Sequence, residues 1–326
     1  MHFSVLLPTR NRPALFQNAL NSALAQQVDG LEVLVIDDGT SDPFAGPLAA
    51  IEATCDERVR FLHLPPSEHG HGQSYALNFG AAQARGRYLC FLDDDDEWSD
   101  PQYLACAAGL IALPGPPLDL LYFDQAAFAK GQRIERTVWI EDLAGMLPPT
   151  GRLEPGGAWR VGAADLLRAH GFSHVNTSIV RRAFFTAIGG FDEALRYECD
   201  RDFYLRAIDQ AQAIVYVPRT VSHHNVPDPA RRDNMSTLVS DIEKRTLQLI
   251  LLEKAIRDSR QEVVRAYARR HRGYTLKHMT MSLYRAKRYR QARSYAFVAL
   301  SAGFNLKWLA FCAWLGLRAT FAPRNS

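Results

Sequence analysis

The sequence predicts an α/β fold, in which a mostly parallel central sheet is flanked by helices and followed by an all-helical region. Three observations predict this fold. Short apolar runs alternate with helix-compatible segments over residues 1–92, carboxylates directly follow two of these runs, and no proline interrupts residues 236–295. Alternating strands and helices are typical of a parallel sheet with right-handed crossovers.

The predicted elements can be placed by their apolar patterns. The first half is expected to contain strands at residues 3–7, 31–36, 59–64 and 88–92, and helices at 12–26, 47–53 and 74–84. The second half is expected to contain strands at 118–123, 176–180 and 214–217, and helices at 181–188 and 203–211. Pro13 suits the first turn of its helix, where its missing N–H costs nothing.

Length and composition bound the domain organisation. The 326 residues suffice for one large domain or two smaller ones, and 47% hydrophobic with 22% charged residues is ordinary globular composition. We expect an α/β domain over residues 1–234, divided into halves at 1–113 and 114–234. A helical region at 235–326 is expected to follow.

Four consecutive aspartates, Asp93 to Asp96, stand directly behind the apolar run at 88–92. Four like charges at a strand end are costly unless a cation neutralises them, and hard divalent cations prefer oxygen ligands that they share with phosphates. The alternative is a solvated acidic turn that caps the next helix. Asp37 and Asp38 follow another strand, so both acidic groups are expected at the ligand-binding edge of the sheet.

Two further groups are candidates for binding a phosphorylated ligand or a nucleotide. Pro8, Thr9 and Arg10 follow the first strand, where polar groups and backbone donors can hold a diphosphate or a nucleotide base. Asn78, on the helix expected at 74–84, can face the same crevice. The alternatives are a helix cap for the first group and a plain helix surface for Asn78.

A second acidic centre lies about a hundred residues downstream, at Asp200 and Asp202. A general base must reach the acceptor while staying off a metal, and a carboxylate remote from the first cluster meets that need. The alternative is a pair of caps for the helix expected from Phe203. His224, which follows the last predicted strand, is a candidate metal ligand because metal sites mix carboxylates with histidine.

The chain resembles the family 2 glycosyltransferases, which have the GT-A (Rossmann-like) fold. The resemblance rests on the order and spacing of five pieces, at residues 7–13, 35–42, 76–86, 91–98 and 189–202. It covers about residues 1–225.

This resemblance implies a nucleotide-sugar donor, such as a UDP-, dTDP- or GDP-sugar, and a Mg²⁺ or Mn²⁺ cofactor. It implies that residues 1–113 bind the donor and the metal and that residues 114–234 bind the acceptor. Thr9, Asp37 and Asp38 would hold the nucleoside, Asp93 and Asp95 would form an Asp-x-Asp metal motif, and Asp94 would touch the ribose. The last aspartate of the run, Asp96, is expected to begin the next helix. Asp200 falls where the family places its catalytic base.

One position departs from the family pattern, because Cys199 stands where the family has a glutamate before Asp200. That departure leaves Asp200 and Asp202 as alternative bases. The predicted function is metal-dependent, inverting transfer of a sugar to a saccharide or lipid-linked hydroxyl in surface polysaccharide or glycoconjugate synthesis. A nucleotidyltransferase and a non-catalytic nucleotide-sugar-binding module are the alternatives.

The C-terminal region predicts a different kind of partner. Residues 257–293 are rich in arginine and lysine with almost no acids, and an aromatic stretch follows at 297–317. This pattern indicates peripheral contact with an anionic membrane through residues 265–322, whereas packing on the catalytic domain is the alternative. Nucleic acid is not an expected partner. Five unpatterned cysteines, with no signal peptide or long apolar span, predict a cytoplasmic protein.

Overall fold

The computed structural model describes residues 2–228, 230 and 234–320. The chain forms two compact units, Met1–Asp228 and Pro229–Ser326. The predicted boundary near residue 234 lies close to this division. Residues 321–326, at the end of the predicted helical region, lie outside the described part.

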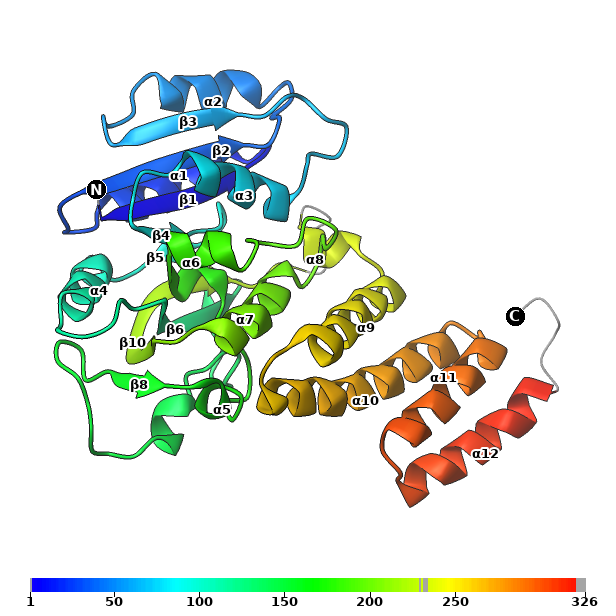
Figure 1. The fold of residues 1–326 in the computed structure, drawn as a ribbon. Coiled ribbons are helices and arrows are strands. Elements are labelled where there is room, and N and C mark those ends of the chain that lie inside the picture. The colour runs from blue at the N-terminus through cyan, green and yellow to red at the C-terminus, as the bar shows by residue number, and fades with distance from the viewer. Residues whose placement is uncertain (1, 229, 231–233, 321–326) are drawn as a thin grey trace. The chain divides into compact units, whose positions relative to one another are not determined.

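Among its described residues, the first unit builds one ten-stranded sheet (Figure 1). Its first half is parallel, in the order β3-β2-β1-β4, with bounds β1 Phe3–Thr9, β2 Leu31–Asp37, β3 Val59–His63 and β4 Tyr88–Phe91. Its second half is mixed: β9 runs antiparallel to β4 and β6, and β10 is parallel to β6. The strands of this half are β5 Glu97–Trp98, β6 Leu120–Ala129, β7 Gln132–Arg133, β8 Trp159–Val161, β9 Ser178–Arg181 and β10 Ile214–Asn225.

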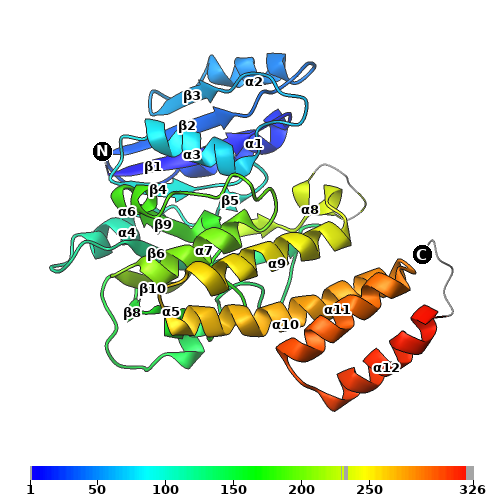
Figure 2. The same ribbon diagram turned by 45° about the vertical axis from the view of Figure 1, so that its right-hand side comes forward.

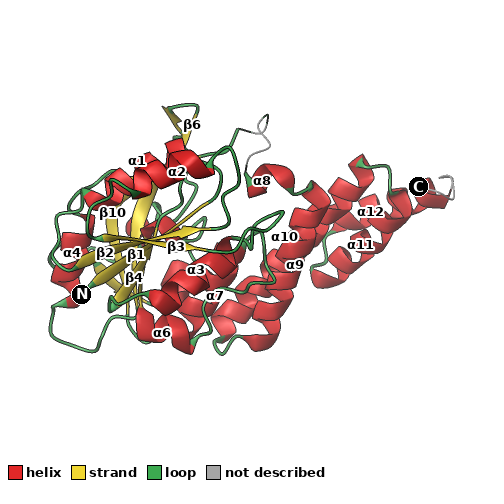
Figure 3. Cartoon of the chain, turned by 90° about the horizontal axis from the view of Figure 1, so that it is seen from above, coloured by secondary structure: helices red, strands yellow, loops and turns green. Residues whose placement is uncertain are grey.

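Helices cover both faces of this sheet (Figure 3). One face carries α1 (Pro13–Leu24) and α2 (Ala45–Glu52), whose buried side chains share a core cluster with α4 (Tyr103–Ile111). The other face carries α3 (Gln73–Gln83), α6 (Arg182–Ala187) and α7 (Cys199–Gln210). Shorter pieces are α5 at Ala163–Leu166 and the 3₁₀ turns η1 at Leu143–Met146 and η2 at Val175–Thr177.

The close approach of α3 to the sheet depends on a glycine. A Cβ atom at Gly80 would lie 2.8 Å from Ile36 Cδ1 and 3.3 Å from a methyl group of Leu6. Alternate residues of β1 serve the opposite face, where Phe3 and Val5 join the cluster under α1. Successive side chains of a strand point to opposite faces of the sheet, so β1 contributes to the packing on both sides.

The predicted α/β sheet followed by helices is confirmed, but several bounds differ. The helix expected from Phe203 begins at Cys199, so Asp200 and Asp202 belong to its first turn. The last strand runs to Asn225 instead of ending at Val217, which places His224 inside β10. Pro218 ends the apolar pattern in the sequence, yet the strand continues past it through register shifts, as bulged strands do.

The second unit is helical throughout the elements that the structure describes (Figure 2). Its helices are α8 Met235–Leu238, α9 Asp241–Asp258, α10 Glu262–Arg285, α11 Tyr289–Ala302 and α12 Leu306–Thr320. Ser240 and Glu243 form a capping box at the start of α9, which satisfies two of the free N–H groups there. From α9 to α12, each helix packs on the next, and a core cluster including Met279, Leu283 and Leu315 lies between them. Among the described residues, no helix combines the length and apolar character needed to span a membrane.

Candidate active site

The aspartate run leaves the sheet at the end of β4 and meets the start of α1. Thr9 Oγ1 donates to Asp94 Oδ2 at 2.8 Å, and Asp94 itself is buried. The Arg12 guanidinium bridges two of the carboxylates, with Nη2 at 2.6 Å from Asp94 and Nη1 at 3.1 Å from Asp95. One arginine therefore offsets part of the negative charge of this cluster.

The carboxylates of the run still repel one another. Burial raises the pKa of Asp94 to about 7, against the opposing effect of Arg12. Burial, followed by the charges of Asp96 and Asp95, raises the pKa of Asp93 well above its usual range. A divalent cation among these groups would lower this repulsion, as expected for an oxygen-rich metal site.

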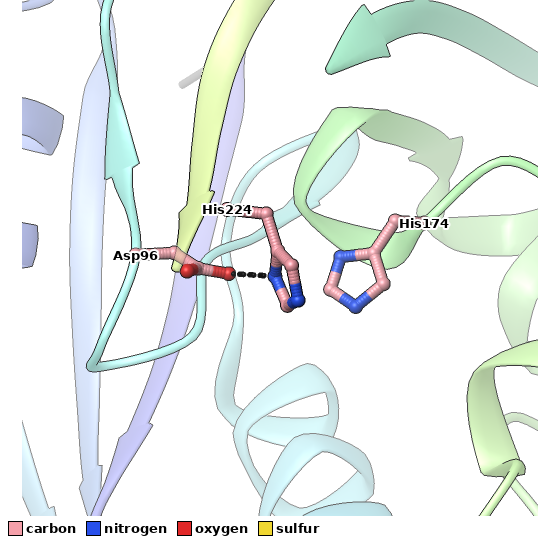
Figure 4. A group of neighbouring side chains, drawn as sticks. All are labelled: Asp96, His174 and His224. Atoms are coloured by element: carbon pink, nitrogen blue, oxygen red, sulfur yellow. Dashed lines mark hydrogen bonds and ion pairs between the residues drawn. The ribbon is translucent and has the colours of Figure 1, made fainter. Parts of the chain in front are cut away.

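Asp96 is not the helix-start residue that we expected. It is 2% exposed and accepts three hydrogen bonds, from Asn176 Nδ2 at 2.6 Å, His224 Nδ1 at 2.7 Å and Asn225 N at 2.7 Å. A buried carboxylate needs such partners, whereas a helix cap would lie at the surface. Asp96 therefore fixes the ring of His224 (Figure 4), and Nε2 is left as that ring's available ligand atom.

The structure adds His174, a residue that the sequence analysis missed. Its ring lies 5.1 Å from that of His224, and the ligand-capable atoms of Asp96, His174 and His224 lie within 4.8 Å of one another (Figure 4). His174 Nε2 lies 3.8 Å from Asp93 Oδ2 and 3.8 Å from Asp200 Oδ2. This imidazole therefore stands between the aspartate run and the second acidic centre.

The protonation of the two histidines differs. Burial, followed by the charge of His224, lowers the pKa of His174 to about 3, so the ring is neutral at physiological pH. Its Nδ1 faces the backbone N–H of Asn176 at 3.4 Å, which places the proton of the neutral ring on Nε2. Burial lowers the pKa of His224 as well, but the hydrogen bond and charge of Asp96 outweigh it, and the net shift is upward.

Asn176, also missed, is the buried hub of the site. Its side-chain Oδ1 accepts from Asp93 N at 3.0 Å, while its Nδ2 donates to Asp96 at 2.6 Å. Its backbone carbonyl accepts from Trp98 Nε1 at 2.9 Å. The signal that could have revealed it is the run at 173–178, which is polar apart from Val175. In the structure all six residues of this run are buried.

The two candidate bases on α7 have different surroundings. Asp200 is partly exposed, its Oδ1 accepts from Arg201 N at 2.8 Å, and burial raises its pKa. Asp202 is 3% exposed and pairs with Arg206 Nε at 2.8 Å one helical turn away. Asp200 thus faces the histidine between the two acidic centres, whereas Asp202 is held within the protein by an arginine.

Cys199 occupies the position of the missing carboxylate. It is buried, and its thiol lies 3.7 Å from Gln73 Oε1. Burial raises the pKa of this thiol to about 12, so Cys199 is neutral and adds no charge beside Asp200. Gln73 in turn donates to Asp93 Oδ1 at 2.6 Å and connects α7 with the aspartate run.

The predicted donor-binding residues at the first two strand ends hold the surrounding loops. Asp37 accepts from Thr40 N and contacts His63 Nδ1, and Asp38 accepts from the backbone N–H groups of residues 71 and 72. Arg10 donates to two backbone carbonyls at residues 67 and 68. Pro8 lies in β1 opposite Ile36. Their donor contacts stay predictions, but all of these groups line the same end of the sheet.

Asn78 has a structural task. Its Nδ2 donates to Phe191 O at 2.9 Å and to Glu193 Oε1 at 2.8 Å, and its Oδ1 accepts from Phe191 N at 2.8 Å. The side-chain amide therefore ties α3 to the loop that precedes α7. Its predicted role in donor binding stays a prediction.

The predicted metal ligands Asp93, Asp95 and His224 are residue types that a divalent cation takes. Asp93 and Asp95 are half-buried carboxylates at the strand end, and Nε2 of His224 is a neutral nitrogen ligand whenever that ring is unprotonated. Hard cations such as Mg²⁺ and Mn²⁺ take carboxylate oxygens readily, and Mn²⁺ also accepts imidazole. Asp96 has both oxygens engaged in hydrogen bonds and fits the role of orienting His224.

Comparison with known proteins places this site in context. Residues 4–111 match the family model described as glycosyl transferase family 2. The chain is 35% identical over 94 residues to the Campylobacter jejuni GalNAc(5)-diNAcBac-PP-undecaprenol beta-1,3-glucosyltransferase, a match that spans 29% of each chain. It is 33% identical over 95 residues to the putative Bacillus subtilis teichuronic acid biosynthesis glycosyltransferase TuaG, covering 29% of this chain and 36% of TuaG. The chain spans about a third or less of the curated relatives that it matches.

Solved structures share the fold over nearly the whole chain. S. aureus TarS 1-349 in complex with UDP-GlcNAc aligns with a TM-score of 0.65 and 19% identity, covering 93% of this chain and 81% of that one. The Pyrobaculum calidifontis mannosyltransferase PcManGT, in complex with GDP-Man and Mn²⁺, aligns with a TM-score of 0.59 and 19% identity, covering 99% and 81%. At this identity the likeness concerns the fold.

Proposed function

Because residues 4–111 match the model of glycosyl transferase family 2, we propose that the chain moves a sugar from a nucleotide-diphosphate donor to an acceptor hydroxyl. The observation that carries this proposal is the convergence of two acidic centres on one histidine. Asp93, at the end of β4, and Asp200, on the first turn of α7, each lie 3.8 Å from His174 Nε2. Sugar transfer needs both a site for the diphosphate and a separate base.

The donor would bind across the ends of β1, β2 and β4. Thr9, Asp37 and Asp38 would contact the nucleoside, and Asp94 the ribose. Thr9 donates a hydrogen bond to Asp94, so the residues that would contact the nucleoside lie next to the aspartate run that would hold the metal. The complexes of TarS with UDP-GlcNAc and of PcManGT with GDP-Man support a nucleotide-sugar donor in a fold of this kind.

A divalent cation, Mg²⁺ or Mn²⁺, would be held by Asp93, Asp95 and His224. When bound, the cation would neutralise the diphosphate charge that develops as the sugar leaves. Arg12 keeps Asp94 and Asp95 in place, and Asp96 keeps His224 in one orientation. The Mn²⁺ in PcManGT supports use of a divalent metal.

Asp200 would act as the base. It would take the proton from the acceptor hydroxyl while the acceptor oxygen forms its bond to the anomeric carbon. The bond from that carbon to the diphosphate oxygen breaks in the same displacement, so the anomeric configuration inverts. His174, neutral and carrying its proton on Nε2, would orient the Asp200 carboxylate without competing for the acceptor proton.

We further propose a saccharide or lipid-linked acceptor and a place in surface polysaccharide or glycoconjugate synthesis. The named specificities of the Campylobacter jejuni and Bacillus subtilis relatives support this class. A nucleotidyltransferase is less well supported because it needs cationic groups for its phosphates. Arg10 instead bonds two backbone carbonyls, and Arg12 pairs with two aspartates.

A thermal-shift screen of nucleotide sugars with and without Mn²⁺ tests the proposal. A donor bound at about 100 times its Kd stabilises a protein by about 2.7 kcal/mol. We expect one nucleotide sugar to raise the Tm clearly with Mn²⁺ and weakly with EDTA, and release of its nucleotide on addition of acceptor saccharide. Equal shifts for nucleotide sugars and free nucleotides, with no nucleotide release, would favour a binding module instead.

A further inference from the structure

The charge of the second unit is one-sided beyond Glu262. Residues 263–326 contain thirteen lysines and arginines and no aspartate or glutamate. Arg288, Arg290 and Arg293 lie exposed at the start and along the first half of α11, and Lys307 is exposed on α12. A surface of this kind attracts polyanions.

α12 is apolar on two opposite faces. One face is buried through Cys312, Leu315 and Ala319, and Cys312 Sγ lies 3.4 Å from the Ala296 carbonyl of α11. The opposite face carries Leu306, Leu309, Ala313 and Leu317 at helical spacing, and Leu306 is 73% and Leu317 66% exposed. Because Leu306 and Leu317 stay largely exposed, no described residue of the second unit covers this face.

Exposed aromatic side chains also occur on α11, on α12 and in the turn between them. Phe297 on α11 is 50% exposed, Phe304 in the turn between α11 and α12 is 70% exposed, and Trp314 on α12 is 42% exposed. Phe297 follows Arg290 and Arg293 at spacings of seven and four residues, so cations and an aromatic ring share one face of α11. Exposed aromatic rings next to cations are typical of segments that lie in a lipid headgroup layer.

We propose that the exposed surface of α11 and α12, which carries Arg290, Arg293, Phe297, Leu306 and Leu317, docks on an anionic lipid bilayer. The leucine and phenylalanine side chains would enter the acyl boundary while the arginines contact lipid phosphates. A second copy of the chain fits the face less well, because it would bring arginines against arginines. A nucleic acid would match the charge but offers no apolar interior for Leu306 and Leu317. This inference does not depend on the proposed glycosyltransferase activity.

Co-sedimentation of the full chain with vesicles tests the proposal. We expect binding to vesicles of phosphatidylglycerol and phosphatidylcholine, little binding to pure phosphatidylcholine, and loss of binding as salt rises. Arg290→Gln with Arg293→Gln is expected to weaken partitioning at least tenfold, because each cation near the surface contributes roughly a fivefold factor. The matched control is Arg133→Gln with Arg136→Gln, which removes the same charge from exposed positions of the first unit.

A second pair of variants tests the apolar contribution. Leu306→Ser with Leu317→Ser is expected to weaken binding to the mixed vesicles severalfold with an unchanged circular dichroism spectrum, since both side chains are exposed. Ile250→Ser, on α9 and 50% exposed, is the matched control and is expected to bind like the unchanged chain. Equal binding to both vesicle types, or unchanged binding in both double variants, overturns the proposal. Sedimentation velocity gives the remaining test. If the unchanged chain is a dimer and the Leu306/Leu317 double variant is a monomer, the face binds a second copy of the chain and the lipid proposal is overturned.

Discussion

At the scale of single residues, Asp200 and Asp202 of α7 carry the same carboxyl group, but their different surroundings give them different roles. Asp200 faces the histidine that also approaches the aspartate run, with one oxygen at 3.8 Å from His174 Nε2. Asp202, two residues later, points elsewhere on the helix and is neutralised by Arg206. Only the first is placed to meet an acceptor held near the donor site, which is why we assign the base to Asp200.

This assignment predicts opposite outcomes for two matched substitutions. Asp200→Asn is expected to bind the donor and Mn²⁺ normally but to lose turnover by a factor of about 10² to 10⁴, the usual contribution of a general base. Asp202→Asn is expected to keep turnover within a few-fold per folded molecule and to lower the free energy of unfolding by about 1–3 kcal/mol, because it weakens a buried ion pair. Steady-state kinetics and urea unfolding measure the two effects. The assignment is wrong if Asp202→Asn loses turnover while Asp200→Asn keeps it.

The sequence locates the carboxylates of the site but not the residues that arrange them. Asp93 and Asp95 can be named because acidic groups at a strand end have a chemical meaning even without coordinates. Asp200 can be named because a general base has to lie apart from the metal-binding cluster. Asn176 begins the strand predicted at 176–180 and His174 stands just before it, so the polar run at 173–178 indicates polar groups near a strand without identifying their partners. Their function arises from contacts across more than 25 residues of sequence in each case, such as the bonds of Asn176 to Asp93 and Asp96.

At the scale of elements, the register of the second half of the sheet was the hardest feature to predict. The apolar patterns of β1, β2 and β4 lie in the predicted places because both faces of these strands are buried. β10 continues past Pro218 through register shifts, and this extension carries His224 to Asp96. A proline in an apolar run normally indicates that a central strand ends there. A prediction from the local sequence therefore ends β10 too early.

A buried pair between β6 and β10 predicts a pH dependence of stability. Tyr216 donates its hydroxyl to Asp124 Oδ1 at 2.9 Å, and burial raises the pKa of Asp124 to about 7 although this bond opposes the shift. The folded protein therefore holds the Asp124 proton more tightly than the unfolded chain does. The resulting stability is fully present below about pH 4 and is lost as pH rises toward 7, at on the order of 1 kcal/mol per pH unit.

Asp124→Asn is the substitution that tests this dependence. The amide keeps an oxygen for Tyr216 and cannot ionise, so the variant is expected to gain stability relative to the unchanged chain as pH rises from 4 to 8. Urea unfolding at several pH values in that range measures the difference. Tyr216→Phe serves as the companion variant: without the hydroxyl bond the Asp124 pKa rises further, and the loss of stability extends to higher pH. Parallel stability curves for all three proteins would refute the explanation.

At the scale of the whole molecule, two kinds of site occur in two different units. The candidate active site lies in the first unit, at the edge where β1, β2 and β4 end, and is acidic. The candidate lipid surface lies in the second unit and is basic and apolar. A lipid-linked acceptor would give both sites a common purpose, since it would hold the substrate hydroxyl at the same boundary that α11 and α12 contact.

Because the two proposals rest on different residues, they are expected to fail separately. Asp95→Ala removes a predicted metal ligand, so this variant should lose the Mn²⁺-dependent rise in Tm with donor and fall at least a hundredfold in turnover, yet still bind phosphatidylglycerol vesicles. Leu306→Ser with Leu317→Ser should show the reverse, with an unchanged donor-dependent Tm rise and weakened vesicle binding. Measuring both properties on both variants distinguishes the cases. If Asp95→Ala kept full turnover, the metal assignment would be wrong, and the proposal of a lipid-binding surface would be unaffected. If the Leu306/Leu317 double variant lost donor binding, the two proposals would not be independent.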